Sequence, residues 1–257
     1  MPRRARTKSV SGIYHVMLRG VNRQEIFHDD EDCYRFLDLL KMYKEKLDYK
    51  LYAWCLMNNH VHLLIEEGNE SISNTMKRIG VCFVYYYHEK YKTVGHLFQD
   101  RFRSENVDTS RYFLTVVRYI HQNPVKAGIT EKPVDWRWSS CLGYYGRRVY
   151  PAKLLDKQKL FNLFSHDNVV AMQLFKEFNE KENDDECLED HIRLRLTDEE
   201  AREFIKTILS PIEIAQFKTL PKNQRNEFLQ QIKQLQGISQ RQSARILGIS
   251  PNLIFKA

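Results

Sequence analysis

The amino-acid sequence predicts an α+β fold, and two kinds of periodicity support this prediction. Apolar and polar residues alternate with period two in Tyr14–Leu18, Lys50–Met57 and His60–Ile65, which is typical of strands. Apolar residues recur at helical spacing in Asp30–Leu47 and Ser71–Tyr91. Strands and helices therefore follow one another in the first part of the chain.

The ends of these elements carry local signals. Asn58 and Asn59 separate the second and third strands and predict a tight hairpin turn, so the two strands should be neighbours. The first helix opens with an acidic turn, and Ser71 can cap the second.

A fourth strand and a third helix complete this part. After Gly95, residues 97–107 (LFQDRFRSENV) alternate like a strand. Residues 108–110 can cap a helix that we expect to end before Pro124, because the residue ahead of a proline resists the helical conformation. The order strand, helix, strand, strand, helix, strand predicts a ferredoxin-like split βαβ sandwich with the third helix against it.

The C-terminal part looks helical, and we expect three regions in all: a core domain (1–150), a helical acidic connector (151–190) and a helical domain (191–257). The charge run at 178–191 predicts a solvated linker. Near the end, a short helix containing Ala244 and Leu247 precedes Gly248 and a second helix that Ser250 can cap. This pattern is typical of a helix-turn-helix, which binds DNA in many proteins and serves only packing in others.

The formal net charge of +7 is unevenly distributed. Residues 1–150 hold 24 Lys and Arg against 17 Asp and Glu, residues 151–190 hold 5 against 10, and residues 191–257 hold 11 against 6. Two basic regions joined by an acidic one suit a nucleic-acid-binding protein, although a moderate charge alone decides little.

Other features narrow the class of protein. The five cysteines lie far apart without CxxC spacing, which indicates reduced core thiols rather than disulfides or a zinc knuckle. No run of about 18 apolar residues and no signal-like N-terminus is present, so we expect a cytoplasmic protein that is neither exported nor inserted in a membrane.

Two histidines indicate a metal site. His60 and His62 flank Val61, so on a strand both imidazoles project from one face, about 6.6 Å apart along the chain. Two neutral imidazoles there can hold one divalent cation. Such a pair also occurs by chance on half-polar strands, but the neighbouring apolar residues favour a functional role.

The third helix carries a possible second half of the site. Tyr119 and Asn123 stand four residues apart, so the phenol and the amide lie on one helical face. An amide oxygen with imidazoles suits Mg²⁺ or Mn²⁺, and a tyrosine needs a base or cation to act as a nucleophile at neutral pH. From spacing alone, a core tyrosine and a helix-terminating asparagine explain the pair slightly better.

Four motifs together resemble those of a known family. MNNHVHLLI, YIHQNPVKAGI, GIYHVMLRGVNRQEIF and GHLFQDRFRSENV, between about Gly12 and Tyr145, resemble the HUH single-strand transposases of the REP-associated tyrosine transposase branch. The resemblance implies that His60, His62 and Asn123 bind Mg²⁺ or Mn²⁺. It also implies that Tyr119 attacks the phosphate.

The resemblance further implies the reaction and its partners. Single-stranded DNA would be cleaved to a 5′-phosphotyrosine and a free 3′-OH that can rejoin strands, on repeats folded as DNA hairpins. No ATP or small-molecule cofactor would be needed. We expect a monomer rather than a homodimer, with the site completed within one chain.

Basic and aromatic residues beside two strands are candidates for DNA contact. Guanidinium groups next to an aromatic ring suit phosphate contact and base stacking. The candidates are Arg19, Asn22, Arg23, Arg101, Phe102, Arg103 and Lys126, each of which could equally be a surface residue. His121 lies on another helix face than Tyr119, so we leave it out of the metal site, although it could assist proton transfer.

Two other functions remain open. A domesticated DNA-binding regulator would use the helix-turn-helix and would have a vestigial catalytic core, which the intact His60, His62, Tyr119 and Asn123 disfavour. An RNA-binding protein on the same scaffold would present aromatic residues on its sheet rather than paired histidines.

Overall fold

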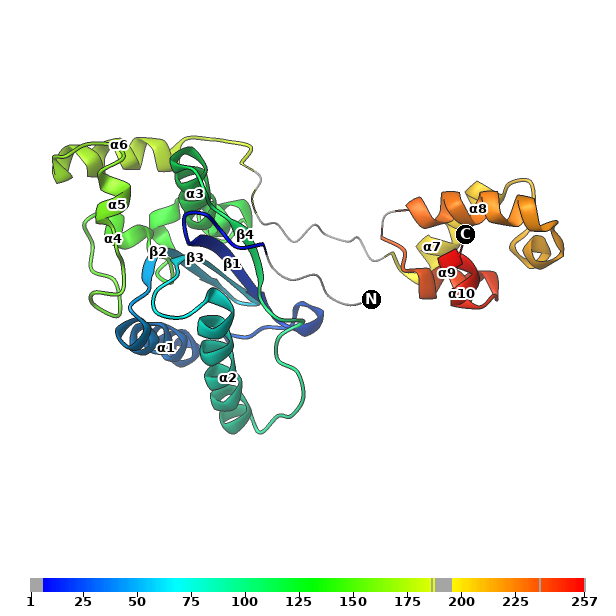
Figure 1. The fold of residues 1–257 in the computed structure, drawn as a ribbon, viewed down its shortest axis with the longest axis horizontal. Coiled ribbons are helices and arrows are strands. Elements are labelled where there is room, and N and C mark those ends of the chain that lie inside the picture. Colours follow the sequence, from blue (N-terminus) through cyan, green and yellow to red (C-terminus); the bar gives the residue numbers. More distant parts are fainter. Residues whose placement is uncertain (1–6, 186, 188–195, 236, 257) are drawn as a thin grey trace. The chain divides into compact units, whose positions relative to one another are not determined.

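A computed structural model describes residues 7–185, 187, 196–235 and 237–256. The chain divides into two compact units, Met1–Leu188 and Glu189–Ala257 (Figure 1), which we call the N-terminal unit and the C-terminal unit.

The N-terminal unit is built on a four-stranded antiparallel sheet. Its strands are β1 (Ile13–Arg19), β2 (Lys50–Met57), β3 (His60–Glu66) and β4 (Arg103–Asn106), in the order β2-β3-β1-β4. The predicted α+β class and the hairpin between β2 and β3 are confirmed.

The fourth strand is much shorter than the sequence predicted. Only Arg103–Asn106 forms a strand paired with β1. Outside it, Phe98 bridges to Gly20, and the Gln99 and Val107 N–H groups bond to the Arg19 and Ile13 carbonyls. In the intervening bend the Asp100 carboxylate accepts a hydrogen bond from the Arg101 backbone N–H at 2.7 Å. Such local bonds compete with strand pairing, which explains why alternation alone overestimated the strand.

The two faces of the sheet carry different helices (Figure 1). Helices α1 (Asp30–Leu47) and α2 (Ile72–Tyr91) pack on the face to which β3 contributes Val61, Leu63 and Ile65. Helix α3 (Ser110–Lys126) packs on the opposite face, which carries His62 and Leu64. Because side chains alternate along a strand, β3 thus has an apolar face towards α1 and α2 and a histidine-bearing face towards α3.

Helix α3 continues through Pro124, so the prediction that it ends before this proline is wrong. Pro124 lies in the last turn, where it removes only one N–H, and the Ala127 N–H still bonds to the Asn123 carbonyl at 3.0 Å. Thr109 caps the start of the helix by accepting a bond from the Tyr112 N–H. Asn123 is therefore part of the helix rather than its terminator.

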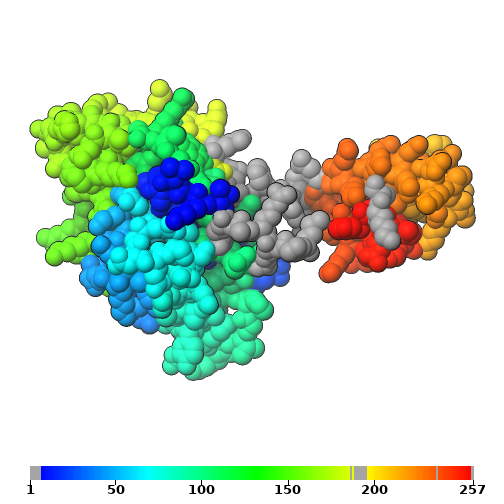
Figure 2. Space-filling view, viewed as in Figure 1, coloured from blue at the N-terminus to red at the C-terminus, as the bar shows by residue number. Residues whose placement is uncertain are grey.

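Residues 130–185 belong to the N-terminal unit and pack on its α3 side. Phe161 and Phe175 are buried in the same cluster as Phe113 and Ile120 of α3. Figure 2 shows the side chains of this segment, in yellow-green, against those of α3. Its helices are η2 (Pro133–Asp135), α4 (Cys141–Tyr144), α5 (Gln158–Phe161) and α6 (Asn168–Glu180).

The same segment hydrogen-bonds to β2. The Leu56 N–H donates to the Trp138 carbonyl at 3.0 Å, and the Ser140 N–H donates to the Trp54 carbonyl at 3.0 Å. The region expected as a connector is thus packed as far as α6. The charge run at 178–191 lies partly outside the described residues, and within it Asp185 pairs with Arg118 at 2.7 Å.

The C-terminal unit is helical in its described residues. Its apolar cluster includes Ala201, Ile205, Phe217 and Ile254. Its helices are α7 (Asp198–Leu209), η3 (Ile214–Thr219), α8 (Lys222–Gln234), α9 (Gln240–Leu247) and α10 (Pro251–Lys256).

The predicted helix pair near the C-terminus is formed by α9 and α10. Ser239 and Gln242 form a capping box at the start of α9, and Gly248 ends the helix with a φ of 65°, a conformation that glycine adopts without strain. Helix α10 has six residues.

Two expectations about the chain as a whole can be compared with the structure. All five cysteines are free, and three of them are buried: Cys33, Cys55 and Cys141. Across the described ranges, no helix combines the length and apolar character that a membrane crossing requires.

Candidate active site

The hairpin and α3 bring the two halves of the predicted site together. His60 and His62 lie on the α3-facing side of β3, with their ring centres 5.0 Å apart. The ring of Tyr119, from α3, lies 5.6 Å from that of His62 at a near-perpendicular angle. His62 and Tyr119 are 2% and 5% exposed, whereas His60 is half-buried at the rim.

Asn123 completes the group one helical turn after Tyr119. Its Oδ1 lies 3.5 Å from His60 Nε2, while its Nδ2 lies 3.5 Å from the backbone carbonyl of Tyr119. The four residues singled out from two distant sequence motifs therefore converge in space.

The hydrogen bonds of His60 indicate which of its ring nitrogens carries the proton and which one faces Asn123. His60 Nδ1 lies 2.6 Å from Asn59 Oδ1, an acceptor, so the ring proton belongs on Nδ1 and Nε2 carries a lone pair. This lone pair faces the Asn123 amide oxygen. At 3.5 Å the contact is long for a hydrogen bond, and both atoms can serve as ligands of one cation.

The donor set suits a hard divalent cation. Burial, with smaller effects from His60 and His15, holds the pKa of His62 well below its usual range, so the ring is neutral as a ligand must be. No group of three or more His, Cys, Asp or Glu side chains is placed to hold a metal within the ranges described above. Two imidazoles and an amide oxygen are the donors that the described residues bring together here, and a divalent cation can use all three.

Sequence reasoning missed two residues beside this group. His15, from β1, is fully buried and places Nε2 3.0 Å from His62 Nδ1. On its other side, His15 Nδ1 lies 3.1 Å from a carboxylate oxygen of Glu105 in β4. A histidine on an alternating strand was a visible signal, but its meaning depends on which strands pair.

The candidate DNA-contacting residues occupy different environments. Asn22 and Arg23 are exposed in η1 (Val21–Arg23), where both have left-handed φ angles, and Arg19 is half-buried at the end of β1. Arg101 and Arg103 are exposed. Phe102 is 7% exposed and packs in the cluster under α1 and α2, so its ring is not available for base stacking in this structure.

Lys126 and His121 lie on opposite sides of α3. The Lys126 ammonium lies 5.2 Å from the centre of the Tyr119 ring and donates to the Asp185 carbonyl at 2.9 Å. His121 is fully buried between Ser140 (2.8 Å) and Asn179 (3.3 Å), and burial lowers its pKa to about 3. His121 thus serves packing away from the Tyr119 site.

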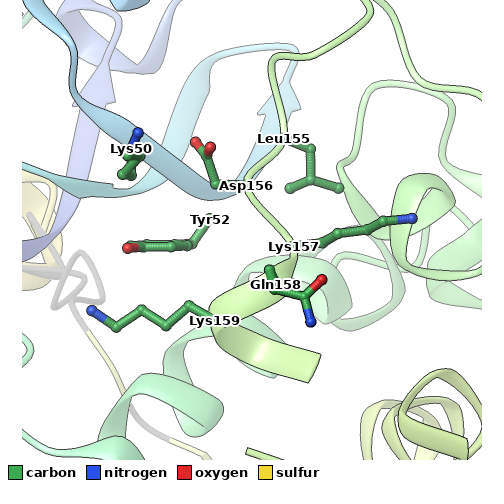
Figure 3. Close-up of a pocket in the computed structure, with 7 residues that line it drawn as sticks. All are labelled: Lys50, Tyr52, Leu155, Asp156, Lys157, Gln158 and Lys159. Atoms are coloured by element: carbon green, nitrogen blue, oxygen red, sulfur yellow. The ribbon is translucent and has the colours of Figure 1, made fainter. Parts of the chain in front are cut away.

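A surface pocket lies apart from these residues (Figure 3). It is lined by Lys50 and Tyr52 at the far end of β2 from the hairpin, and by residues 155–159. Lys159 pairs with Glu66 at 2.9 Å, and Asp156 pairs with Lys44. The pocket contains none of the predicted catalytic or metal-binding residues.

Comparisons with known proteins agree with the sequence motifs. Residues 8–123 match the family described as "Transposase IS200 like". The chain is 26% identical over 110 residues to a REP-associated tyrosine transposase of Escherichia coli (strain K12), covering 42% of this chain and 64% of the relative. The match thus spans less than two thirds of that protein. The resemblance proposed from the motifs is confirmed for this part of the chain.

A solved structure is also similar. It is described as the structure of a REP-associated tyrosine transposase bound to a REP hairpin, and it shares 20% identity with this chain. The match covers 62% of this chain and 96% of the other, with a TM-score of 0.49.

Proposed function

We propose, on the premise that residues 8–123 form an IS200-like transposase domain, that this protein is a metal-dependent single-strand DNA endonuclease and strand transferase. The observation that carries the proposal is the convergence of Tyr119 with His60, His62 and Asn123 from two separate elements. A core tyrosine would not need two imidazoles and an amide oxygen beside its ring.

In the proposed reaction Tyr119 is the nucleophile. Its hydroxyl oxygen attacks the phosphorus of a phosphodiester, the bond to the 3′ oxygen breaks, and a 5′-phosphotyrosine forms. The tyrosine gives up one proton, and the leaving 3′ oxygen takes one up as a 3′-OH. The reverse attack by a 3′-OH rejoins strands, because the phosphodiester energy is kept in the intermediate.

His60, His62 and Asn123 would hold the cation. A bound Mg²⁺ or Mn²⁺ would supply stabilisation of negative charge on the phosphate. The protein's own contribution is to hold Tyr119 beside these three residues through α3, where the residue is 5% exposed.

The exposed basic residues support a single-stranded DNA or DNA hairpin substrate, in line with the relative named for its association with REP sequences. Arg23, Arg101 and Arg103 are exposed, and Arg19 and Asn22 adjoin them in β1 and η1. Lys126, whose ammonium lies 5.2 Å from the centre of the Tyr119 ring, would supply a positive charge to a phosphate at the site. Phe102 is left out of this surface because it is buried.

The remaining parts of the proposal concern architecture. The strand order supports a ferredoxin-like core, and the α9–α10 pair supports a helix-turn-helix that adds DNA contacts. Because all four site residues come from one chain, we propose a monomer that completes its own site. We place it in the cytoplasm, where its DNA substrate lies.

The test is adduct formation on DNA. Purified protein is incubated with labelled single-stranded hairpin oligonucleotides from repeats that flank its gene, with Mn²⁺ or with EDTA, beside Tyr119→Phe. We expect an adduct that survives denaturing electrophoresis, requires the metal, and is absent in the variant.

A different result would favour the regulator hypothesis. Specific binding of the hairpins with no adduct in Mg²⁺ or Mn²⁺ would leave the α9–α10 pair as the functional element. Against that hypothesis, α10 is short for a helix that reads bases.

A further inference from the structure

A row of polar side chains runs from β4 through β1 to β3 beneath the active site. His15 and Glu105 are paired residues on β1 and β4, so their side chains lie on one face of the sheet. His62 of β3 pairs with Met17, two residues along β1 from His15, and therefore projects from the same face. The sheet thus aligns a carboxylate and two imidazoles across three strands.

The hydrogen bonds in this row have one consistent direction. Glu105 accepts from the Tyr112 hydroxyl at 2.5 Å, and the same oxygen lies 3.1 Å from His15 Nδ1. A carboxylate can only accept, so His15 carries its proton on Nδ1. His15 is 0% exposed, and a neutral ring that carries its proton on Nδ1 presents Nε2 as an acceptor.

The tautomer of His15 in turn determines the tautomer of His62. His15 Nε2 lies 3.0 Å from His62 Nδ1, and an acceptor there requires the His62 proton on Nδ1. The other nitrogen of His62, Nε2, is left with the lone pair that a metal ligand needs. His60 also carries its proton on Nδ1, because that nitrogen lies beside the side-chain oxygen of Asn59.

We propose that His15 and Glu105 are positioning residues that select the ring nitrogen of His62 presented to the active site. Neither residue touches the substrate or the cation in this scheme; both act through His62. Outer partners of this kind fix the tautomer and orientation of a ligating histidine. The inference deepens the proposed metal site and rests on that part of the proposed function.

Burial makes the selection strong. His15 and His62 are 0% and 2% exposed, so water cannot replace the bond between them. If either ring took its other tautomer, two ring N–H groups or two lone pairs would face each other in an interior without water. An unmade bond of this kind carries the desolvation cost of both buried groups.

The experiment determines which ring nitrogen of His62 is protonated. Long-range ¹H–¹⁵N correlation spectra of the full chain, without metal, distinguish a ring protonated on Nδ1 from one protonated on Nε2, and a His62→Gln variant assigns the signals. Mn²⁺ affinity is measured in parallel by calorimetry on the same samples.

Three variants of β4 separate positioning from general damage. Glu105→Leu removes the acceptor, Glu105→Gln keeps a carbonyl oxygen that can accept from His15, and Asn106→Leu makes a matched change on the other face of the strand. We expect Glu105→Leu to lose the single Nδ1-protonated form of His62 and to weaken Mn²⁺ binding about 10- to 100-fold. Glu105→Gln and Asn106→Leu should keep both properties.

Two outcomes would overturn the inference: a wild-type His62 protonated on Nε2, or an unchanged His62 ring in Glu105→Leu. If Glu105→Leu fails to fold, the wild-type tautomer and the Glu105→Gln spectrum still decide. Absence of Mn²⁺ binding in the wild type would instead defeat the proposed metal site, while the ring spectra would still test the positioning role.

Discussion

The two units of this chain differ in what they bury. The C-terminal unit buries an almost wholly apolar cluster, with Ser243 as the polar residue buried among its described positions. The N-terminal unit buries three histidines, His15, His62 and His121, between its sheet and its helices. Buried imidazoles cost a folded domain stability, and two of the three, His15 and His62, lie beside each other at the proposed metal site.

The largest expected effect would test whether function is confined to the N-terminal unit. We expect His62→Ala to weaken Mn²⁺ binding by more than about 100-fold, because a ligand should matter more than an outer partner. Adduct formation on hairpin DNA should be lost with it. The measurement is calorimetric titration beside the adduct assay.

A matched change in the C-terminal unit serves as the control. Arg245→Ala removes an exposed side chain that pairs with Asp198 and should leave Mn²⁺ affinity unchanged. A comparable loss of metal binding in that variant would end the contrast between the two units.

The next prediction tests whether α6 stabilises the N-terminal unit. Phe175 of α6 is fully buried against α3, so Phe175→Ala should destabilise this unit by about 3–5 kcal/mol. Trp54, Trp136 and Trp138 are the chain's three tryptophans, so urea unfolding followed by their fluorescence reports this unit alone.

The counterpart is Ile205→Ala in the buried cluster of the C-terminal unit, with an expected cost of about 2–5 kcal/mol. It should change the helical circular dichroism signal and leave the fluorescence midpoint in place. A shift of the fluorescence midpoint in Ile205→Ala would show that the units unfold together.

Lowering the pH should destabilise the N-terminal unit more than the C-terminal unit, with a smaller effect than the core substitutions have. Burial lowers the pKa of His121 to about 3 and lowers that of His15, whereas an unfolded histidine titrates near pH 6.5. As pH falls below about 6.5 the unfolded chain binds protons that the folded unit does not. Each such histidine therefore costs about 1.4 kcal/mol of stability per pH unit until its folded pKa is reached.

The measurement is the urea midpoint by fluorescence at pH 7 and pH 5, in EDTA. No histidine occurs in residues 196–256, so the circular dichroism transition of the C-terminal unit should move less over this range. An equal shift of both transitions would contradict the assignment.

The smallest expected effect lies at the start of α9. Ser239 accepts a hydrogen bond from the Gln242 N–H, so Ser239→Ala should cost the C-terminal unit about 1 kcal/mol. Thermal unfolding by circular dichroism measures it, with Ser250→Ala as the comparison because the bond from Asn252 N–H to Ser250 Oγ is longer, at 3.4 Å. Adduct formation should be unaffected by Ser239→Ala if the helix pair acts only in packing.

Local patterns were sufficient for much of the fold. Period-two alternation located β1, β2 and β3 and placed His60 and His62 on one face, and helical spacing placed Tyr119 with Asn123. Two local predictions were wrong. Alternation overestimated the fourth strand, where the Asp100 side chain bonds to the backbone in a bend. Helix α3 continues through Pro124, because a proline is tolerated in the last turn.

The rest depended on contacts between distant segments. The role of His15 requires the register of β1 against β3 and β4, which no single strand specifies. The burial of Phe102 likewise depends on packing under α1 and α2, which its position between two arginines did not reveal.

The hydrogen bonds that residues 138–140 make with β2 bear on how this protein behaves at high concentration. An outer strand with unpaired backbone groups is a template on which other chains can stack, and it is a common start of aggregation. Here the chain's own Trp138 and Ser140 occupy positions along that strand, and Asp156 bonds to Leu51 further along. These segments occupy backbone groups of β2 that would otherwise be open to another copy of the chain.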